Sequence, residues 1–296
     1  MSAPVERSWS ASRVSPEMLF TVGAVSQYLG AATAFELFEE LGPPTVALLR
    51  VAGAGAVLVL VRRSWRRRWS RAELVWTAAF GAALASMNLF FYLAIERVPL
   101  GNSVAIEFLG PIAVAALGTR TLRSGAALVL AIGGVVALAG FAPPEAQLGA
   151  LFSLIAGALW AGYIILGHRV ARAGMAVDGL GVGMLIGALV ISPAGIADGG
   201  GGMSAAVGTP LLLAGGVAAG VLSNVIPYGI DQLVMQRLAR ARFALLQALL
   251  PVTATLIGLV WLHQVLSLRE VAGIAAVIAA IVINRESDPT PGDVVG

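Results

Sequence analysis

The side chains best suited to chemistry in this chain are a few polar groups inside long apolar stretches. Glu107 and Arg50 are opposite charges in two such stretches. A charge inside a membrane costs about 2.5–3.5 kcal/mol at mid-span, so each of these residues needs a partner or a role. Their depths allow them to pair. The pattern leaves three interpretations open: a structural ion pair, a Glu107 carboxylate that takes up protons or contacts the amine of a substrate, or exposure to solvent in a wide cavity.

Two further stretches each place an amide and a phenol on one helical face. Asn88 and Tyr92 are four residues apart, and so are Asn224 and Tyr228. Residues at this spacing lie on the same side of a helix. Facing stripes of this kind either line a polar path or hydrogen-bond to neighbouring helices, which is common for asparagine in lipid.

Aromatic residues and prolines complete the candidate set. Trp160 and Tyr163 lie mid-stretch, and Tyr28 occupies the matching place near the N-terminus. They either line a cavity or fill the core. Proline interrupts three apolar stretches, where it either frames a transport site or makes a passive packing kink. These prolines are Pro111, Pro227 and Pro251.

The composition indicates that these residues belong to a membrane protein. Hydrophobic residues make up 58% of the 296 residues and charged residues only 12%, whereas soluble domains are about a quarter charged. The chain has no cysteine and two histidines, which argues against thiol chemistry, disulfides and metal sites. We therefore expect an integral membrane protein without a cofactor or a bound metal.

The apolar stretches predict an all-α protein with ten transmembrane helices. A helix needs roughly 20 apolar residues to cross a bilayer. The stretches cover about 17–36, 45–61, 73–95, 100–118, 125–142, 148–168, 178–197, 210–236, 243–262 and 267–284.

Arginine sets the expected orientation. All 19 basic residues are arginine, and 16 of them fall in segments on the side of the N-terminus. Arg97 and Arg269 fall on the other side, and Arg50 lies within a span. Positively charged loops stay in the cytoplasm, so both termini are predicted to be cytoplasmic. The six-arginine segment 62–71 fits a lipid-facing loop better than a nucleic-acid site.

An internal repeat divides the chain near residue 143. At an offset of 140 residues Pro111 falls on Pro251, and Glu107 falls on its near-isostere Gln247. Five helices per half require the second half to be inverted, an arrangement typical of secondary transporters with a central site. The expected parts are a disordered tail (1–15), two five-helix repeats (16–143 and 144–285) and a second disordered tail (286–296).

One family shares this architecture and several local motifs. Residues 87–92 (MNLFFY), 98–101 (VPLG), 107–111 (EFLGP) and 226–228 (IPY) resemble EamA-domain amino-acid exporters of the drug/metabolite transporter superfamily. The sequence is most similar to threonine/homoserine and aromatic amino-acid (YddG-type) exporters. The resemblance departs at Leu250 and Gln264, where this group often has acidic residues.

The resemblance implies a carrier, not an enzyme, in the bacterial cytoplasmic membrane. It would export aromatic and small neutral amino acids such as threonine or methionine by alternating access. Its partners would be the amino acid and the lipid bilayer, with no nucleic acid, and a monomer would suffice. The alternative is another small metabolite or drug as substrate; a channel or an intramembrane enzyme fits less well.

Overall fold

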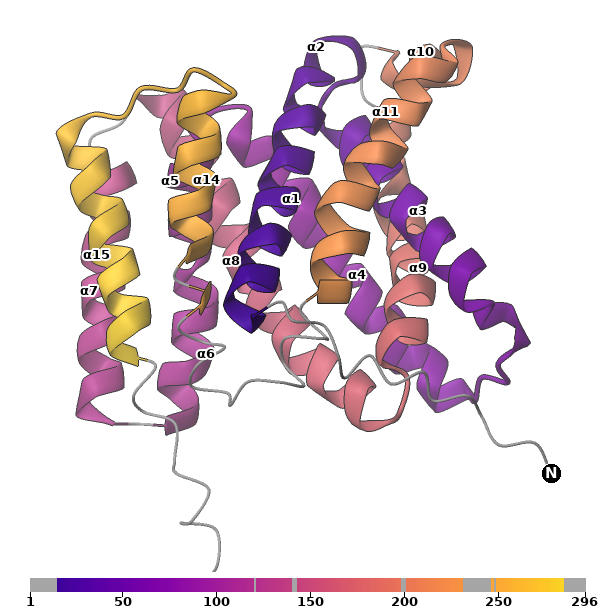
Figure 1. Cartoon of the computed structure of the whole chain (residues 1–296), viewed down its shortest axis with the longest axis horizontal. Helices are drawn as coiled ribbons and strands as arrows, with labels where there is room; N and C mark the ends of the chain where they lie inside the picture. Colours follow the sequence, from indigo (N-terminus) through magenta and orange to yellow (C-terminus); the bar gives the residue numbers. More distant parts are fainter. Residues whose placement is uncertain are drawn as a thin grey trace, which may run out of the picture.

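The computed structural model is a bundle of helices (Figure 1). It describes residues 15–119, 121–139, 143–197, 201–230, 246–247 and 249–284, and no strand occurs in these ranges. The elements are α1 (Pro16–Glu36), α2 (Phe38–Leu41), α3 (Pro43–Arg62), η1 (Ser64–Arg66), α4 (Arg71–Ile95), α5 (Leu100–Glu107), α6 (Leu109–Thr119), α7 (Leu122–Ala139), α8 (Pro144–Arg172), α9 (Ala176–Ile196), α10 (Gly202–Gly208), α11 (Pro210–Gly220), η2 (Val221–Val225), α14 (Leu249–Val260) and α15 (Leu268–Asn284).

Helix lengths confirm the all-helical membrane class. Six helices are long and apolar enough to cross a bilayer: Met18–Glu36, Pro43–Arg62, Arg71–Ile95, Pro144–Gly167, Val177–Ile196 and Pro210–Ile230. Shorter apolar helices cover Leu100–Val114, Leu122–Leu138 and Leu249–Val260. The predicted stretch 100–118 is interrupted at Phe108, where a turn separates α5 from α6.

Local sequence explains where the first long helices begin. The Ser15 hydroxyl accepts a hydrogen bond from the Met18 amide at 3.2 Å, and Pro16 follows at the first helical position. Ser15 is thus the cap of α1, although the predicted disordered tail included it. Ser70 and Glu73 form a reciprocal capping box at the start of α4. The rest of the predicted tails, residues 1–14 and 286–296, lies outside the described residues, as does residue 285.

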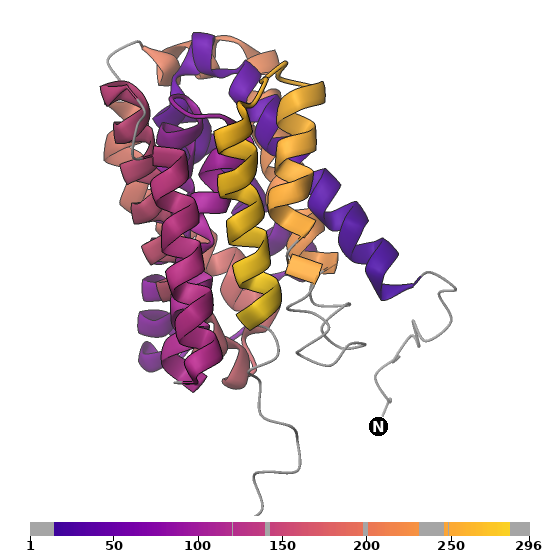
Figure 2. The same cartoon turned by 90° about the vertical axis from the view of Figure 1, so that its left-hand side faces the viewer.

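The helices run alternately up and down, so that α1 begins and α15 ends at the same end of the bundle (Figure 1). Helix α3 packs on α9, α4 packs on both α8 and α9, and α7 packs on α15 (Figures 1 and 2). Glycine allows very close crossings, as where a Cβ atom on Gly81 of α4 would clash with the backbone of Gly183 on α9. Such small-residue contacts are typical of helix packing in membranes.

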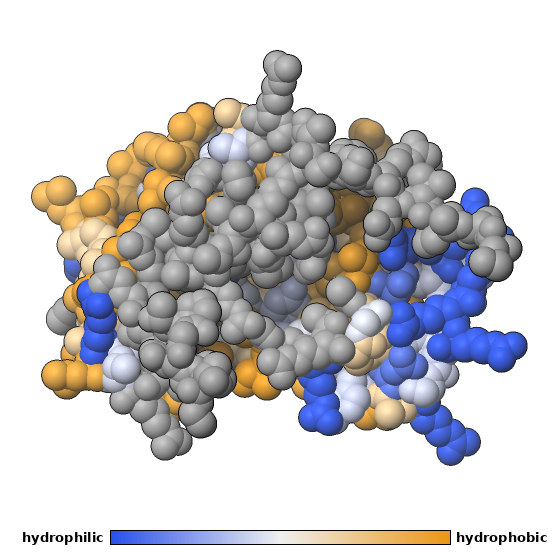
Figure 3. Space-filling model, turned by 60° about the horizontal axis from the view of Figure 1, so that its bottom comes forward, coloured by the Kyte–Doolittle hydropathy of each residue, from blue (hydrophilic) through white to orange (hydrophobic). Residues whose placement is uncertain are grey.

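The end of the bundle that holds the start of α1 is strongly basic. Figure 3 shows a hydrophilic patch on this face, on the same side as the link from α3 to α4. The exposed arginines of that link are Arg62, Arg63, Arg66, Arg68 and Arg71.

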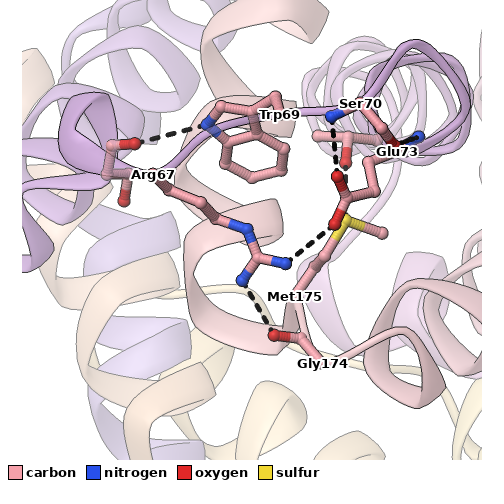
Figure 4. A network of polar contacts seen from close by, with 8 residues as sticks. Arg67, Trp69, Ser70, Glu73, Gly174 and Met175 are labelled. Atoms are coloured by element: carbon pink, nitrogen blue, oxygen red, sulfur yellow. Dashed lines mark hydrogen bonds and ion pairs between the residues drawn. The ribbon is translucent and has the colours of Figure 1, made fainter.

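A polar network ties this link to the turn between α8 and α9 (Figure 4). The two terminal nitrogens of Arg67 donate to Glu73 Oε1 at 2.9 Å and to the Gly174 carbonyl at 3.0 Å. The Trp69 indole donates to the Ser64 carbonyl at 3.3 Å. The network therefore fixes the basic link against a segment about 100 residues later in the chain.

Candidate functional site

Arg50 is a buried charge held by a distant segment of the chain. It lies on α3 and is only 4% exposed. Its Nε donates to the Ser223 hydroxyl, and its Nη2 donates to Asn224 Oδ1 at 3.0 Å and to the Ser223 carbonyl at 3.4 Å. Since an unpaired charge in an apolar core is costly, these contacts explain how α3 tolerates the arginine.

Pro227 explains why the Ser223 carbonyl is available to Arg50. Proline has no amide hydrogen and cannot donate to the carbonyl four residues before it, which here belongs to Ser223. The backbone widens into the π-helical turn η2 at this point, as often happens at functional sites. Gly30 on α1 permits a close approach, because a Cβ there would lie 2.8 Å from the Ser223 amide nitrogen.

Tyr92 on α4 completes the surroundings of the guanidinium. Its side chain is fully buried, and the Arg50 Cζ atom lies 5.0 Å from the ring centroid, which is a cation–π geometry. Asn88 lies one turn earlier on α4, and its Nδ2 donates to the Leu84 carbonyl at 2.8 Å. This side-chain nitrogen thus donates to the backbone of its own helix.

Glu107 lies at the break between α5 and α6. It is 7% exposed and is the last residue of α5. Pro111 in α6 cannot donate to the Glu107 carbonyl, so the helix lacks a hydrogen bond here. Gly157 on α8 makes room for this carbonyl, because a Cβ there would lie 2.6 Å from the oxygen.

Arg50 and Glu107 do not form the expected ion pair. Among the described residues no nitrogen of Arg50 lies within 4.0 Å of a Glu107 oxygen, and Glu107 Oε1 has no hydrogen-bond partner. The two groups still interact electrostatically at longer range. The pairing was wrong because the contacts with Ser223 and Asn224 hold the guanidinium on η2.

Contacts between aromatic rings join these elements. Trp160 on α8 meets Phe108 edge to face, with ring centroids 4.9 Å apart. Tyr163, one turn later, stacks on Phe80 at 4.9 Å and lies 6.1 Å from Tyr228. These contacts bring α4, α8 and the α5–α6 break together with the helical residues that follow η2.

Tyr28 on α1 connects the aromatic and the charged residues. It is 3% exposed and lies near Glu107, Tyr228 and Arg50. The structure thus gathers most of the predicted site residues around one region. They are Tyr28, Arg50, Tyr92, Glu107, Trp160, Tyr163, Asn224 and Tyr228.

Two further predicted residues, Gln247 and Pro251, lie just before α14 and in its first turn. Gln247 is partly buried in a short helical stretch, and Pro251 is the third residue of α14. Residues 231–245 and 248 lie outside the described residues, so the predicted helix interruption at Pro251 is not tested. The departure at Gln264 has a structural role, because its Oε1 accepts a hydrogen bond from the Leu100 amide at 2.9 Å at the start of α5.

Sequence reasoning missed Ser223, Phe108 and Phe80. Ser223 holds the Arg50 side chain, and the two phenylalanines position Trp160 and Tyr163. Ser223 lies four residues before Pro227, and that spacing was a usable signal for a free carbonyl.

Comparisons with known proteins agree with this architecture. Residues 147–285 match the family described as the EamA-like transporter family. Over 92% of its length the chain is 33% identical to the threonine/homoserine exporter RhtA of Salmonella typhimurium, of which it covers 93%. The identity and both coverages are the same for RhtA of Escherichia coli K12.

A solved crystal structure shares the fold. The alignment covers 92% of this chain and 98% of that chain, with a TM-score of 0.53 and 20% sequence identity. The extent of the match to the RhtA proteins, together with the family match in the second half, shows that this chain is a multi-pass membrane transporter of the EamA-like family, in the drug/metabolite transporter superfamily.

Proposed function

We propose that this protein exports small neutral amino acids across the bacterial cytoplasmic membrane. Threonine and homoserine are the first candidates, because the similar RhtA proteins are named as exporters of these two. Methionine and aromatic amino acids follow, and the rings of Phe108 and Trp160 suit their larger side chains. The single observation that most supports an amino acid is the buried pair of opposite charges, Arg50 and Glu107, which do not neutralise each other.

The proposed topology has ten crossings with both termini in the cytoplasm. The described helices alternate in direction, and the arginine-rich link between α3 and α4 lies at the end where α1 begins and α15 ends (Figure 1). Arg97 and Arg269 lie at the opposite end. Because positive residues concentrate on the cytoplasmic side, this distribution supports the orientation.

The proposed halves, 16–143 and 144–285, are related by a two-fold axis in the membrane plane. Two packing pairs support this relation, α3 with α9 and α7 with α15. In chain order these are the second and seventh, and the fifth and tenth, of the proposed crossings. Such an axis maps each pair onto itself, as inverted repeats require.

Alternating access would use the discontinuous helices of the site. The break at Phe108 and the π-turn η2 each lack regular α-helical hydrogen bonding, so they are the natural places for bending. In this proposal one chain contains the whole site and works as a monomer. The residues that contact the substrate or its path are Tyr28, Asn88, Tyr92, Glu107, Trp160, Tyr163, Asn224, Tyr228 and Gln247, while Arg50, Pro111, Pro227 and Pro251 support the framework.

Uptake into liposomes that contain the purified protein tests the proposal. A panel of labelled threonine, homoserine, methionine and phenylalanine is measured with and without an imposed proton gradient. We expect saturable uptake of threonine, and its response to the gradient distinguishes facilitated diffusion from proton coupling. Intact protein that transports none of these amino acids would contradict the proposal and direct the search to other small metabolites or drugs.

A further inference from the structure

The guanidinium of Arg50 has one occupied edge and one nitrogen without a partner. Its Nε and Nη2 point to Ser223 and Asn224. Its Nη1 is buried, and no hydrogen-bond partner for it exists in the described part of the chain. Guanidinium nitrogens are strong donors that normally find acceptors when buried. The free nitrogen therefore indicates a place for an anionic ligand group.

Asn224 offers a second donor beside the same guanidinium. The residue is 1% exposed, and its Oδ1 accepts from Arg50 Nη2 at 3.0 Å. Its Nδ2 is buried without a partner among the described residues. Two free donors on hydrogen-bonded residues, one of them charged, suit the two oxygens of a carboxylate.

In the part of the chain that the structure describes, Glu107 has a buried acceptor atom without a donor. Its Oε1 is buried and, within the described ranges, accepts no hydrogen bond. A buried carboxylate is costly unless a cation is paired with it, and Arg50 is not within ion-pair distance. A ligand ammonium group would supply the missing cation.

We propose that the site binds an amino acid in a fixed direction, with its carboxylate on Arg50 and Asn224 and its ammonium on Glu107. This inference rests on the proposed function and assigns Arg50 a ligand contact in addition to its place in the framework. In a zwitterionic amino acid a single carbon separates the two charged groups. Such a ligand bridges two protein charges that do not touch, and it offers partners to Arg50 Nη1, Asn224 Nδ2 and Glu107 Oε1.

Neither charge alone accounts for such recognition. A ligand without the carboxylate leaves Arg50 Nη1 unsatisfied, and a ligand without the amine leaves the carboxyl of Glu107 unsatisfied. Because an unsatisfied buried polar group is penalised, sites of this kind discriminate strongly against analogues that lack one group.

Two near-isosteric substitutions combined with two truncated ligands test the direction of binding. The truncated ligands are 3-hydroxybutanoate, which is threonine without its amine, and 1-amino-2-propanol, which is threonine without its carboxylate. Each ligand competes with labelled threonine for the purified protein. Arg50→Ala is unsuitable, because it also removes the contacts that hold η2.

Glu107→Gln is expected to weaken binding of threonine and 1-amino-2-propanol by about tenfold or more. Binding of 3-hydroxybutanoate should stay within about twofold, because this ligand has no ammonium group. Asn224→Asp places a carboxylate against Arg50 and should produce the opposite pattern, with threonine and 3-hydroxybutanoate weakened and 1-amino-2-propanol spared.

Glu96→Gln is the matched control, since Glu96 is exposed at the end of α4 and pairs with Arg97. It should leave the binding of all three ligands unchanged. Each variant should have the same gel-filtration elution volume and melting temperature as the wild type. If each substitution weakens all three ligands equally, the inference is overturned while the amino-acid exporter survives. If the wild type binds and transports no amino acid, the proposed function fails, and this inference fails with it.

Discussion

Gly157 of α8 lies directly against the carbonyl of Glu107, at the point where α5 ends. A Cβ on Gly157 would lie 2.6 Å from that oxygen and 3.1 Å from the Glu107 Cα. Contacts this short do not occur without displacement of one of the two helices. The absence of a side chain at Gly157 therefore allows α8 to approach the backbone of Glu107, the residue that carries the buried carboxyl of the site.

The first prediction concerns this contact. Gly157→Ala should destabilise the protein by about 1–3 kcal/mol, because the added methyl group overpacks a helix crossing. It should also reduce threonine uptake, since Glu107 is displaced. Thermal unfolding and liposome uptake measure the two effects.

Gly162→Ala provides the control on the same helix. Nothing lies within 4 Å of a Cβ at Gly162. The substitution should therefore leave threonine uptake unchanged and the melting temperature equal or slightly higher. Equal loss of uptake in both variants would contradict a specific role for the Gly157 contact.

The second prediction separates stability from function at η2. Pro227→Ala restores an amide that can donate to the Ser223 carbonyl, and regular helix then competes with the contact to Arg50. We expect an unchanged or higher melting temperature together with slower transport. Pro210→Ala serves for comparison, because Pro210 lies at the first position of α11, where no amide donor is needed. A Pro227 variant with normal transport would show that the freed carbonyl is dispensable.

The third prediction concerns the aromatic wall. Trp160→Ala removes the ring that meets Phe108 and should change the order of preference among threonine, methionine and phenylalanine with little loss of folding. Competition for labelled threonine uptake measures the change. Trp65, which is 56% exposed, is the control for loss of a tryptophan. An unchanged substrate profile in the Trp160 variant would assign this residue to core packing.

The fourth prediction tests the orientation, and the absence of cysteine from the sequence makes it direct. Arg68→Cys places a thiol on the exposed basic link, and Val265→Cys places one at the opposite end on a residue that is 84% exposed. In cells with a permeable outer membrane, an impermeant maleimide should label only the thiol at 265. The thiol at 68 should react after lysis. The reverse pattern would place the termini outside.

Much of the fold follows from the sequence, because the responsible signals are local. A run of about 20 apolar residues is sufficient for a helix that can cross a membrane, and six such helices occur where the stretches predict them. Pro111 marks the end of α5 through a missing amide, which is a property of one residue and its own helix. The types and spacing of Tyr92, Glu107 and Tyr228 likewise predict a shared polar region within the apolar helices.

The partners of those residues depend on tertiary structure. The one partner that the sequence suggested for Arg50 was Glu107, but Arg50 contacts Ser223, 173 residues later. No local pattern indicates the contact with Ser223, because it depends on the close approach of α1 to η2 at Gly30 and of α11 to α3 at Gly220. The sequence by itself determined which charged residues lie inside apolar helices, and the packing of distant helices decided which of their atoms find hydrogen-bond partners.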